Sequence, residues 1–417
     1  MTTATVADSG ASSDTHTGSL TAWALTVYSA MFVWFFVVAN ITTRALGVRP
    51  RTGPGVEFPG VKWFGHLLRW DGGWYLNIAE SGYSFTPDHQ SNVAFFPAYP
   101  NMMRLVHLLT HDMVWAGIAV TFVAGAAGSV LVTKWCQVKG MSRRATMATL
   151  LVMVCYPYSW YLFGVVYSDA LFVAAVVGAF ILVERDRHVL AGLVGIVASA
   201  DRPTGLAVIV GLMAVACEHS GVFDRTVSHD AAVVGSWFER FSVPNRVHWK
   251  KLTPRLLGVA LSSIGAGSFM LDLWYRFGDP LLFVNIQKTW GQGGGWNTLL
   301  KESLFHDIET GWRSTYVRTN LAQGFFMLCG FVSIPWVGRR FGWGYSLFVG
   351  ALLFMPLYGA RDFQGTGRYM LALVPVTAIV GEWLASRTQM IRIGWLTISS
   401  LLLTLMMVGF THGIYLA

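Results

Sequence analysis

Charged residues are scarce in this sequence. Asp, Glu, Lys and Arg make up 12% of the 417 residues, whereas hydrophobic residues make up 54%. A single water-soluble core cannot bury so much apolar surface, so a soluble globular protein is excluded. The apolar residues form long continuous runs rather than alternating ten-residue segments, which favours a bundle of membrane-spanning helices over a β-barrel.

Cysteine is equally rare. The four cysteines lie far apart, with no Cys-x-x-Cys pair and no histidine at metal-ligand spacing. Neither a disulfide framework nor a zinc site is therefore expected, and we interpret the cysteines as small buried hydrophobic residues. They are Cys136, Cys155, Cys217 and Cys329.

The N-terminal segment lacks the basic region and the small-residue cleavage site of a signal peptide. Its composition predicts a disordered cytosolic tail over residues 1–18, followed by one membrane-embedded domain over residues 19–417. The net charge of +8 does not call for nucleic acid, because basic residues gather in cytoplasmic loops and face anionic lipid headgroups. We therefore expect the lipid bilayer, and not nucleic acid, to be the partner of the basic residues.

Apolar runs of spanning length predict an all-α polytopic protein with about 10 to 11 transmembrane helices. Four basic residues closely follow the run 113–132, so the next loop is expected to be cytoplasmic. Counting spans from there makes 218–254 a cytoplasmic connector and places the loops 46–112, 277–318 and 359–367 on the extracytoplasmic side. The expected spans are about 20–45, 113–132, 145–160, 164–184, 256–276, 319–337, 342–358, 368–385 and 393–414.

The apolar run 188–217 is too long for one simple span and is interrupted by Asp201-Arg202-Pro203-Thr204-Gly205. A single crossing would place the later basic loops on the wrong side of the membrane. The sequence therefore favours two half-spans or a re-entrant pair that meet at this break. It does not decide between these two arrangements.

The first long loop carries a carboxylate among aromatic rings, at Asp71. The residues Trp63, Leu67, Trp70 and Trp74 recur at helical spacing, which predicts an interfacial helix with Asp71 at the edge of its apolar arc. The Gly-Gly pair after the acid is expected to break or bend this helix. A second interfacial helix is expected over 94–110.

An acid in such surroundings has two interpretations. Asp71 is either a structural group paired with Arg69, or an acid or base whose environment is suited to catalysis. The residues alone leave both open.

Five patches of the sequence, in order, resemble PIG-V-type mannosyltransferases, the GPI mannosyltransferase 2 family and its bacterial relatives. The second patch departs from the family, which usually has Tyr-Ser-Glu where this chain has Tyr-Ser-Asp. The patches are Trp70-Asp71-Gly72-Gly73-Trp74-Tyr75 with Ala94-Phe95-Phe96-Pro97-Ala98-Tyr99-Pro100; Tyr167-Ser168-Asp169-Ala170-Leu171-Phe172; Asp201-Arg202-Pro203-Thr204-Gly205; Tyr275-Arg276-Phe277-Gly278-Asp279-Pro280 with Trp290; and Gly367-Arg368-Tyr369-Met370 with Pro375.

The resemblance implies a GT-C glycosyltransferase fold in the plasma membrane, with its active site on the extracytoplasmic side. It implies an inverting transfer of mannose from a polyprenyl-phosphate-mannose donor to a hydroxyl of a glycolipid, such as a phosphatidylinositol mannoside. An acid in the first loop is the general base of this class, and Asp71 is the position that matches it. The sugar, the acceptor and the linkage are not readable from any motif in the sequence.

Four cations of the extracytoplasmic loops and span ends could bind the donor phosphate. Arg202 and Arg368 lie in patches of the resemblance, although Arg202 could instead pair with Asp201. For Arg361 and Lys288, solvation in a loop is the alternative interpretation.

Six further residues are candidates for sugar or acceptor binding: Trp70, Trp74, Tyr75, His89, Asp169 and Trp290. Asp169 could equally cap the helix that follows it, and the tryptophans could belong to an aromatic belt at the membrane interface. The Asp88-His89 pair could bind a divalent metal, but no Asp-x-Asp pattern surrounds Asp71. We therefore expect a reaction without a metal or another cofactor.

The sequence leaves two alternative functions to consider. A non-catalytic flippase of lipid-linked sugar would need charged residues along a path through the bilayer, whereas most ionisable residues here fall at span ends. A related transferase could use another polyprenyl-phosphate sugar or a protein acceptor.

Overall fold

The computed structural model describes residues 11–47, 65–224, 246–248, 251, 254–311 and 313–416. In this part the regular secondary structure is helical, apart from one short antiparallel pair of strands, β1 (Phe223–Asp224) and β2 (Arg246–Val247). The residues of the single predicted domain group into two compact units, which we describe separately. Unit 1 contains Met1–Gly82, Tyr99–Val177 and Thr377–Ala417, and unit 2 contains Tyr83–Ala98 and Gly178–Val376.

Five helices in the described part of the chain are long and apolar enough to cross a membrane, and a sixth span results if one pair bent by 77° counts as one. The chain is therefore a multi-pass helical membrane protein, as predicted. The five spans are Leu20–Leu46, Met113–Val138, Leu256–Phe277, Thr315–Phe341 and Gln389–His412; the bent pair is Thr366–Ala372 with Val374–Ala385.

The described spans are fewer than the 10 to 11 predicted, because several apolar runs form shorter helices. The expected spans at 145–160 and 164–184 correspond to the shorter helices α5 (Arg143–Val154) and α6 (Asp169–Glu184), which are separated by an almost wholly buried irregular segment. Buried aromatic side chains fill this segment, so its apolar residues pack inside the protein.

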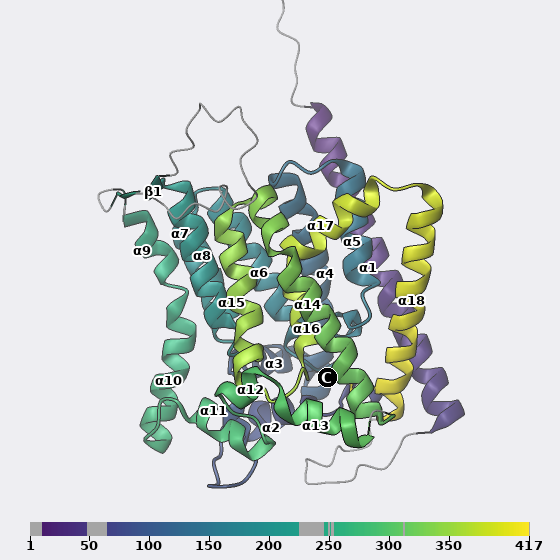
Figure 1. Cartoon of the computed structure of the whole chain (residues 1–417), viewed down its shortest axis with the longest axis vertical. Coiled ribbons are helices and arrows are strands. Elements are labelled where there is room, and N and C mark those ends of the chain that lie inside the picture. Colours follow the sequence, from purple (N-terminus) through teal and green to yellow (C-terminus); the bar gives the residue numbers. More distant parts are fainter. Residues whose placement is uncertain are drawn as a thin grey trace, which may run out of the picture. The chain divides into compact units, whose positions relative to one another are not determined.

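Unit 1 is built around the helices α1, α4 and α18, with α1 lying beside both others (Figure 1). The helix α1 begins at Ala11, within the segment predicted to be a disordered tail. The elements assigned to this unit are α1 (Ala11–Leu46), η1 (Gly65–Leu67), α2 (Gly72–Ser81), α3 (Ala98–Thr110), α4 (Met113–Val138), α5 (Arg143–Val154), η3 (Ser159–Leu162), α6 (Asp169–Glu184), α17 (Val374–Ala385) and α18 (Gln389–His412), of which α3, α6 and α17 cross the unit boundaries.

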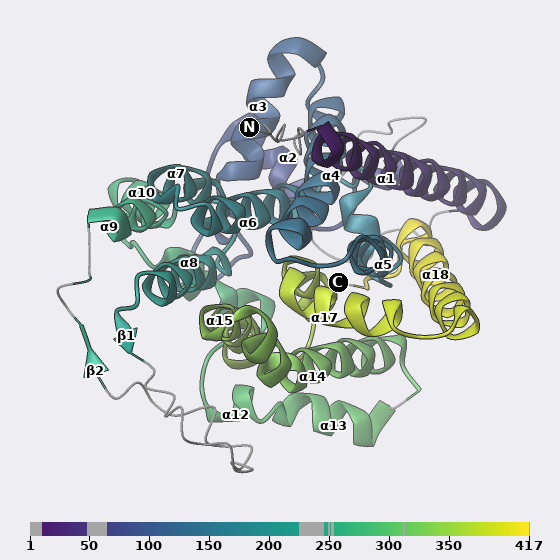
Figure 2. The same ribbon diagram turned by 90° about the horizontal axis from the view of Figure 1, so that it is seen from above.

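Unit 2 contains the helices α8, α14 and α15, which pack side by side, and a second group formed by α7, α9 and α10 (Figure 2). Cys329 is exposed on α14, contrary to the expectation of four buried cysteines. The elements of this unit are η2 (Asn92–Ala94), α7 (His188–Ser199), α8 (Gly205–His219), α9 (Pro254–Ala260), α10 (Ser263–Phe277), α11 (Leu282–Asn285), η6 (Ile286–Trp290), α12 (Trp296–Leu299), α13 (Glu302–Gly311), α14 (Thr315–Phe341), α15 (Trp343–Gly359), α16 (Thr366–Tyr369) and η7 (Met370–Ala372).

The predicted break in the run 188–217 is confirmed. The helix α7 ends at Ser199 and α8 begins at Gly205, so the interruption coincides with the Asp-Arg-Pro-Thr segment. Pro203 has no N–H to continue the hydrogen-bond ladder.

Opposite charges lie at the two ends of α15. The Glu218 carboxylate accepts hydrogen bonds from the backbone N–H groups of Trp343 (3.0 Å) and Gly344 (2.9 Å) at the first turn. At the last turn, the Lys301 ammonium donates to backbone carbonyls. Both charges complement the helix dipole and satisfy groups that a helix leaves unpaired at its ends.

Glycine allows α7 and α9 to pack with their backbones in contact. A Cβ atom at Gly192 would overlap the carbonyl oxygen of Gly258, and no side-chain rotation can relieve an overlap with backbone. Small residues support close helix packing in membranes in this way.

We expect Gly192→Ala to force α7 and α9 apart and to destabilise the protein by about 1–3 kcal/mol. Thermal unfolding in detergent measures this change. Gly267→Ala is the matched control, because that position in α10 faces open space and alanine has the higher helix propensity. Equal unfolding temperatures for the two variants would contradict the packing at Gly192.

Candidate functional site

Asp71 lies in a tight turn that leads into α2. The Gly72 N–H donates to the Arg69 carbonyl (2.9 Å) and the Gly73 N–H donates to the Trp70 carbonyl (3.1 Å). Trp70 adopts a φ of 51°, a left-handed conformation that is uncommon for a bulky residue. Such strain persists only where surrounding contacts enforce it, and it is concentrated at functional sites.

The helix after Asp71 differs from the prediction. The Gly-Gly pair was expected to break a helix that had passed through the acid, but α2 instead begins at Gly72. The reason is close packing: a Cβ atom at Gly72 would lie 2.9 Å from the carbonyl oxygen of Val166. The predicted arc also began at Trp63, which lies outside the described residues.

A second segment of unit 1 holds this turn in place. The Val166 N–H donates to the Leu67 carbonyl (2.9 Å), and the Asp71 N–H donates to the Tyr167 hydroxyl oxygen (3.1 Å). The hydroxyl groups of Tyr75 and Ser168 are hydrogen-bonded at 3.0 Å. The first two patches of the resemblance, 96 residues apart at the Asp71–Tyr167 contact, therefore meet in the structure.

Tyr167 is itself rigidly held. Its side chain is fully buried, and its ring centroid lies 4.8 Å from that of Tyr161 and 6.3 Å from that of Tyr75. The Thr121 hydroxyl lies 2.9 Å from the carbonyl oxygen of Val165 on the same segment. Because the Tyr167 side chain is buried and held by its neighbours, its hydrogen bond to the Asp71 N–H restrains the position of the Asp71 backbone.

We expect Tyr167→Phe to leave the fold intact and to weaken the anchoring of Asp71. The loss of one hydrogen bond should cost about 0.5–1.5 kcal/mol of stability, measured by thermal unfolding. Tyr28→Phe is the matched control, because it removes a hydroxyl bonded at 2.8 Å to the Leu162 carbonyl in the same unit. If Asp71 is catalytic, only Tyr167→Phe should also lower turnover; equal turnover in both variants would contradict the anchoring role.

The far end of α2 is fixed by an arginine. Arg104 on α3 donates from Nε to the Ala79 carbonyl (2.8 Å) and from Nη2 to the Ile78 carbonyl (2.7 Å). Guanidinium at a helix C-terminus satisfies free carbonyls and complements the dipole. The short helix that follows Asp71 is therefore anchored at both ends.

Arg69 does not pair with Asp71. In the described part of the chain, Arg69 forms no ion pair, and its Nε is buried without a hydrogen-bond partner. Burial lowers the pKa of this guanidinium. The interpretation of Asp71 as a mere salt-bridge partner of Arg69 is therefore wrong.

The other predicted site residues of unit 1 lie close to Asp71 in the sequence or on the Tyr167 segment. Trp70 packs edge-on against Tyr415 at 5.0 Å between ring centroids, and Trp74 is half-buried in the first turn of α2. Asp169 begins α6 and is 1% exposed. It follows directly after Ser168, the hydrogen-bond partner of Tyr75.

In unit 2, Arg202 is largely buried and forms an ion pair with the fully buried Asp201 at 3.5 Å. The pairing considered as an alternative therefore does occur. The Arg202 guanidinium also lies 6.0 Å from the ring centroid of Tyr369, the neighbour of Arg368 in α16. Two candidate phosphate-binding arginines thus belong to adjacent segments of this unit.

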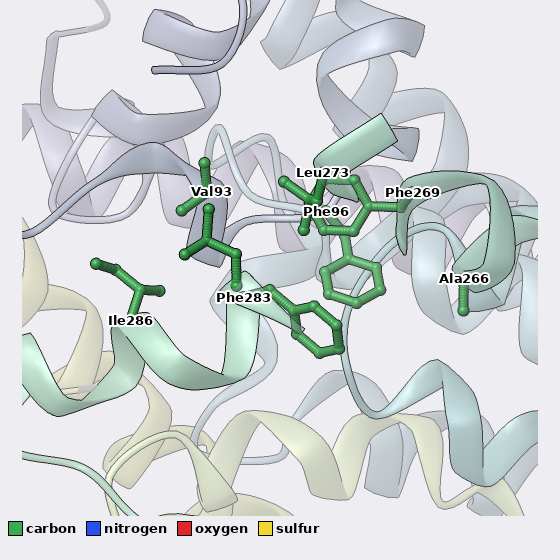
Figure 3. Close-up of a cluster of buried hydrophobic side chains, with 8 residues drawn as sticks. Val93, Phe96, Ala266, Phe269, Leu273, Phe283 and Ile286 are labelled. Atoms are coloured by element: carbon green, nitrogen blue, oxygen red, sulfur yellow. The ribbon is translucent and has the colours of Figure 1, made fainter. Parts of the chain in front are cut away.

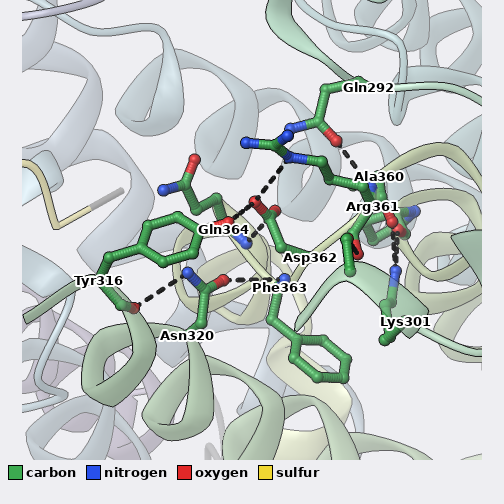
Figure 4. Close-up of polar contacts among 11 residues, drawn as sticks. Gln292, Lys301, Tyr316, Asn320, Ala360, Arg361, Asp362, Phe363 and Gln364 are labelled. Carbon is green, nitrogen blue, oxygen red and sulfur yellow. Dashed lines mark hydrogen bonds and ion pairs between the residues drawn. The ribbon is translucent and has the colours of Figure 1, made fainter. Parts of the chain in front are cut away.

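Other predicted residues of unit 2 are more exposed. Lys288 in η6 and His89 in the loop before η2 both face away from the protein interior. Arg361 is about half exposed, and its backbone N–H donates to Gln292 Oε1 at 2.7 Å (Figure 4). The Trp290 ring lies 6.3 Å from that of Phe95.

Four sequence patches of the resemblance converge in unit 2. Phe96 of the first patch packs with Phe269 and Phe283 in a buried cluster near the Tyr275–Pro280 patch (Figure 3). The Ala98 N–H donates to the Ala200 carbonyl at 2.8 Å, next to the Asp201 patch. That patch in turn reaches Tyr369 through Arg202.

Sequence reasoning missed a polar cluster around Asp362. This carboxylate is 1% exposed and accepts hydrogen bonds from the Tyr316 hydroxyl (2.7 Å) and the Gln364 N–H (3.0 Å). The Lys301 ammonium, 4% exposed as a residue, donates to the carbonyls of Pro356, Leu357 and Ala360 (Figure 4). No sequence signal separates Lys301 from a solvated loop lysine, because its acceptors lie more than 50 residues away.

A scan against models of protein families finds no match to this chain, and a search among curated proteins finds no relative.

Proposed function

We propose that this protein is an inverting membrane glycosyltransferase that moves mannose from a polyprenyl-phosphate-mannose donor to a hydroxyl of a glycolipid. The main support is the anchoring of the Asp71 turn by the Tyr167 segment. The family resemblance links these two patches only by sequence, and in this chain they are in direct contact. Asp71 is half-buried and stands at the start of a helix that is fixed at both ends.

In the proposed reaction, an acceptor hydroxyl oxygen attacks the anomeric carbon of the donor sugar. Its proton passes to the Asp71 carboxylate, while the bond between the anomeric carbon and the phosphate oxygen breaks. The bond electrons leave with the polyprenyl phosphate, so one displacement inverts the configuration. A positioned carboxylate base contributes typically 10²–10⁴-fold to such a step.

Cations must stabilise the leaving phosphate, because negative charge develops on its bridging oxygen. Arg202, Arg368, Arg361 and Lys288 are our candidates. The charge of Arg202 is largely balanced by Asp201, and Arg361 is paired with Asp362 at 3.8 Å. These partners reduce the charge that Arg202 and Arg361 can offer to a ligand.

The aromatic residues Trp70, Trp74, Tyr75 and Trp290 are our candidates for contacts with the sugar or the acceptor, with His89 and Asp169 as polar candidates. The multi-pass architecture and the basic loops support a plasma-membrane protein whose site faces away from the cytoplasm. We infer this orientation from the positive-inside rule, which places the Lys- and Arg-rich loops in the cytoplasm.

The test is donor-dependent sugar transfer by the purified protein in defined liposomes, with and without a chelator. Transfer that follows donor concentration, with inverted anomeric configuration in the product, supports the proposal. Movement of lipid-linked sugar across the bilayer without transfer would overturn it in favour of the flippase alternative. Loss of transfer on chelation would overturn the expected metal independence.

A further inference from the structure

The Arg69 side chain has an unusual electrostatic position. The residue is half-buried, and its Nε is buried without a hydrogen-bond partner among the described residues. A buried N–H donor of a charged group is costly when no hydrogen bond compensates for its desolvation. Such a group persists most readily where an anionic ligand completes its surroundings.

The position of Arg69 is fixed relative to Asp71. Both residues belong to the turn closed by the hydrogen bond from the Gly72 N–H to the Arg69 carbonyl. The ends of such a turn lie within about 7 Å of each other between Cα atoms. Hydrogen bonds from Val166 and to Tyr167 hold this turn on both sides of Arg69.

The strained residue of the turn lies between the two. Trp70, with its left-handed φ of 51°, separates the arginine from the acid. Its ring packs edge-on against the ring of Tyr415. The turn therefore presents one cation and one carboxylate from a single, rigid piece of backbone.

We propose that Arg69 binds the phosphate of the prenyl-phosphate donor. This inference rests on the proposed function and deepens it. In a sugar phosphate, the anomeric carbon and the phosphorus are joined through one oxygen. In an inverting displacement the base takes the proton of the acceptor hydroxyl on one face of the anomeric carbon, and the phosphate leaves from the opposite face. The carboxylate and the phosphate-binding cation must therefore flank one reacting centre, and Asp71 and Arg69 belong to one turn from which both could reach it.

The chemistry of arginine suits this role. The guanidinium presents planar N–H donors that match two phosphate oxygens, and its hydrogen bonds to anions are stronger than those between neutral groups. The group keeps its positive charge throughout the reaction, so it can stabilise the charge that grows on the bridging oxygen.

The test measures binding separately from turnover. Thermal shift and equilibrium binding with farnesyl phosphate, and with farnesol as the phosphate-free probe, are measured for wild type, Asp71→Asn and Arg69→Met. We expect farnesyl phosphate to bind wild type and Asp71→Asn alike, and to bind Arg69→Met at least tenfold more weakly. Farnesol should bind all three equally.

Two variants control for folding and for charge. Arg392→Met also removes an arginine whose Nε is buried without a partner in the described part of unit 1. Phe410, whose ring lies 6.4 Å from that of Tyr167, is 18 residues further along α18, so Arg392 lies roughly 27 Å away along this helix. We expect it to bind farnesyl phosphate normally. Arg69→Lys keeps a charge and should bind between wild type and Arg69→Met, and it replaces the methionine variant if that one does not fold.

The outcomes separate this inference from the proposed function. Binding of farnesyl phosphate to Arg69→Met within twofold of wild type would overturn the role of Arg69, even if wild type transfers sugar. Selective loss in Arg69→Met supports the site, even if wild type transfers no sugar and the glycosyltransferase proposal fails. An equal loss in Arg392→Met would show a general charge effect and would also overturn the inference.

Discussion

Asp71→Asn is expected to lower the turnover of sugar transfer by about 10²–10⁴-fold, the usual contribution of a general base. Asparagine has nearly the same shape, so the turn and the start of α2 should persist, but its amide cannot accept the proton of the acceptor hydroxyl. Because binding contacts are retained, KM for the donor should change little. Steady-state transfer with the purified variant measures both constants.

Asp112→Asn is the matched control for this experiment. Asp112 is an exposed acid of unit 1 whose carboxylate caps α4 by accepting from the Trp115 N–H at 2.9 Å. Asparagine is an equally good N-cap, so stability and turnover should both stay at wild-type levels. Near-normal turnover in Asp71→Asn would show that Asp71 is not the base.

Lys301→Met is expected to produce the largest loss of stability. Methionine fills a similar volume but leaves the carbonyls of Pro356, Leu357 and Ala360 without their shared donor at the end of α15. Leaving a buried acceptor without its donor costs about 1–3 kcal/mol per group, and three carbonyls share this donor. Thermal unfolding in detergent measures the loss, and Lys288→Met, which removes an exposed lysine of the same loop, should cost much less.

The pH dependence of stability gives a second readout for Lys301. Burial lowers the pKa of this ammonium from 10.5 to about 8, and the negative charge of Asp362 opposes the shift only in part. The unfolded chain therefore holds the proton more tightly than the folded protein. It follows that this group increases stability as pH rises from about 8 to about 10.5.

The comparison with Lys301→Met isolates this contribution. The stability advantage of wild type over the variant should grow between pH 8 and pH 10.5 and stay flat below pH 7. An advantage that instead shrinks as the pH rises above 8 would show that the folded protein holds the proton of Lys301 more tightly than the unfolded chain.

The membrane character of the chain could be predicted from sequence because it depends on composition and local order. Long apolar runs must form helices in lipid, where each backbone group needs a partner within its own segment. The break at Pro203 was equally local, since proline and two charged neighbours interrupt a helix wherever it lies. These features need no knowledge of distant residues.

The start of α2 could not be predicted in this way. The periodicity of the tryptophans pointed to a helix through Asp71, whereas Gly72 approaches Val166 and Trp70 takes a left-handed conformation. Contacts between segments about 95 residues apart override local helix preference. The sequence pointed to Asp71 as a candidate, but it gave no sign of the backbone anchor Tyr167.

By itself, the sequence determined that this protein is a multi-pass helical membrane protein with a single carboxylate singled out in its first long loop. The tertiary structure alone decided which groups surround that carboxylate. It formed no ion pair between Arg69 and Asp71 in the described part of the chain, joined Asp71 to Tyr167 and buried Lys301 at the end of α15. The physical reason is that hydropathy is a property of each segment, whereas hydrogen bonds and ion pairs depend on the chain bringing distant segments together.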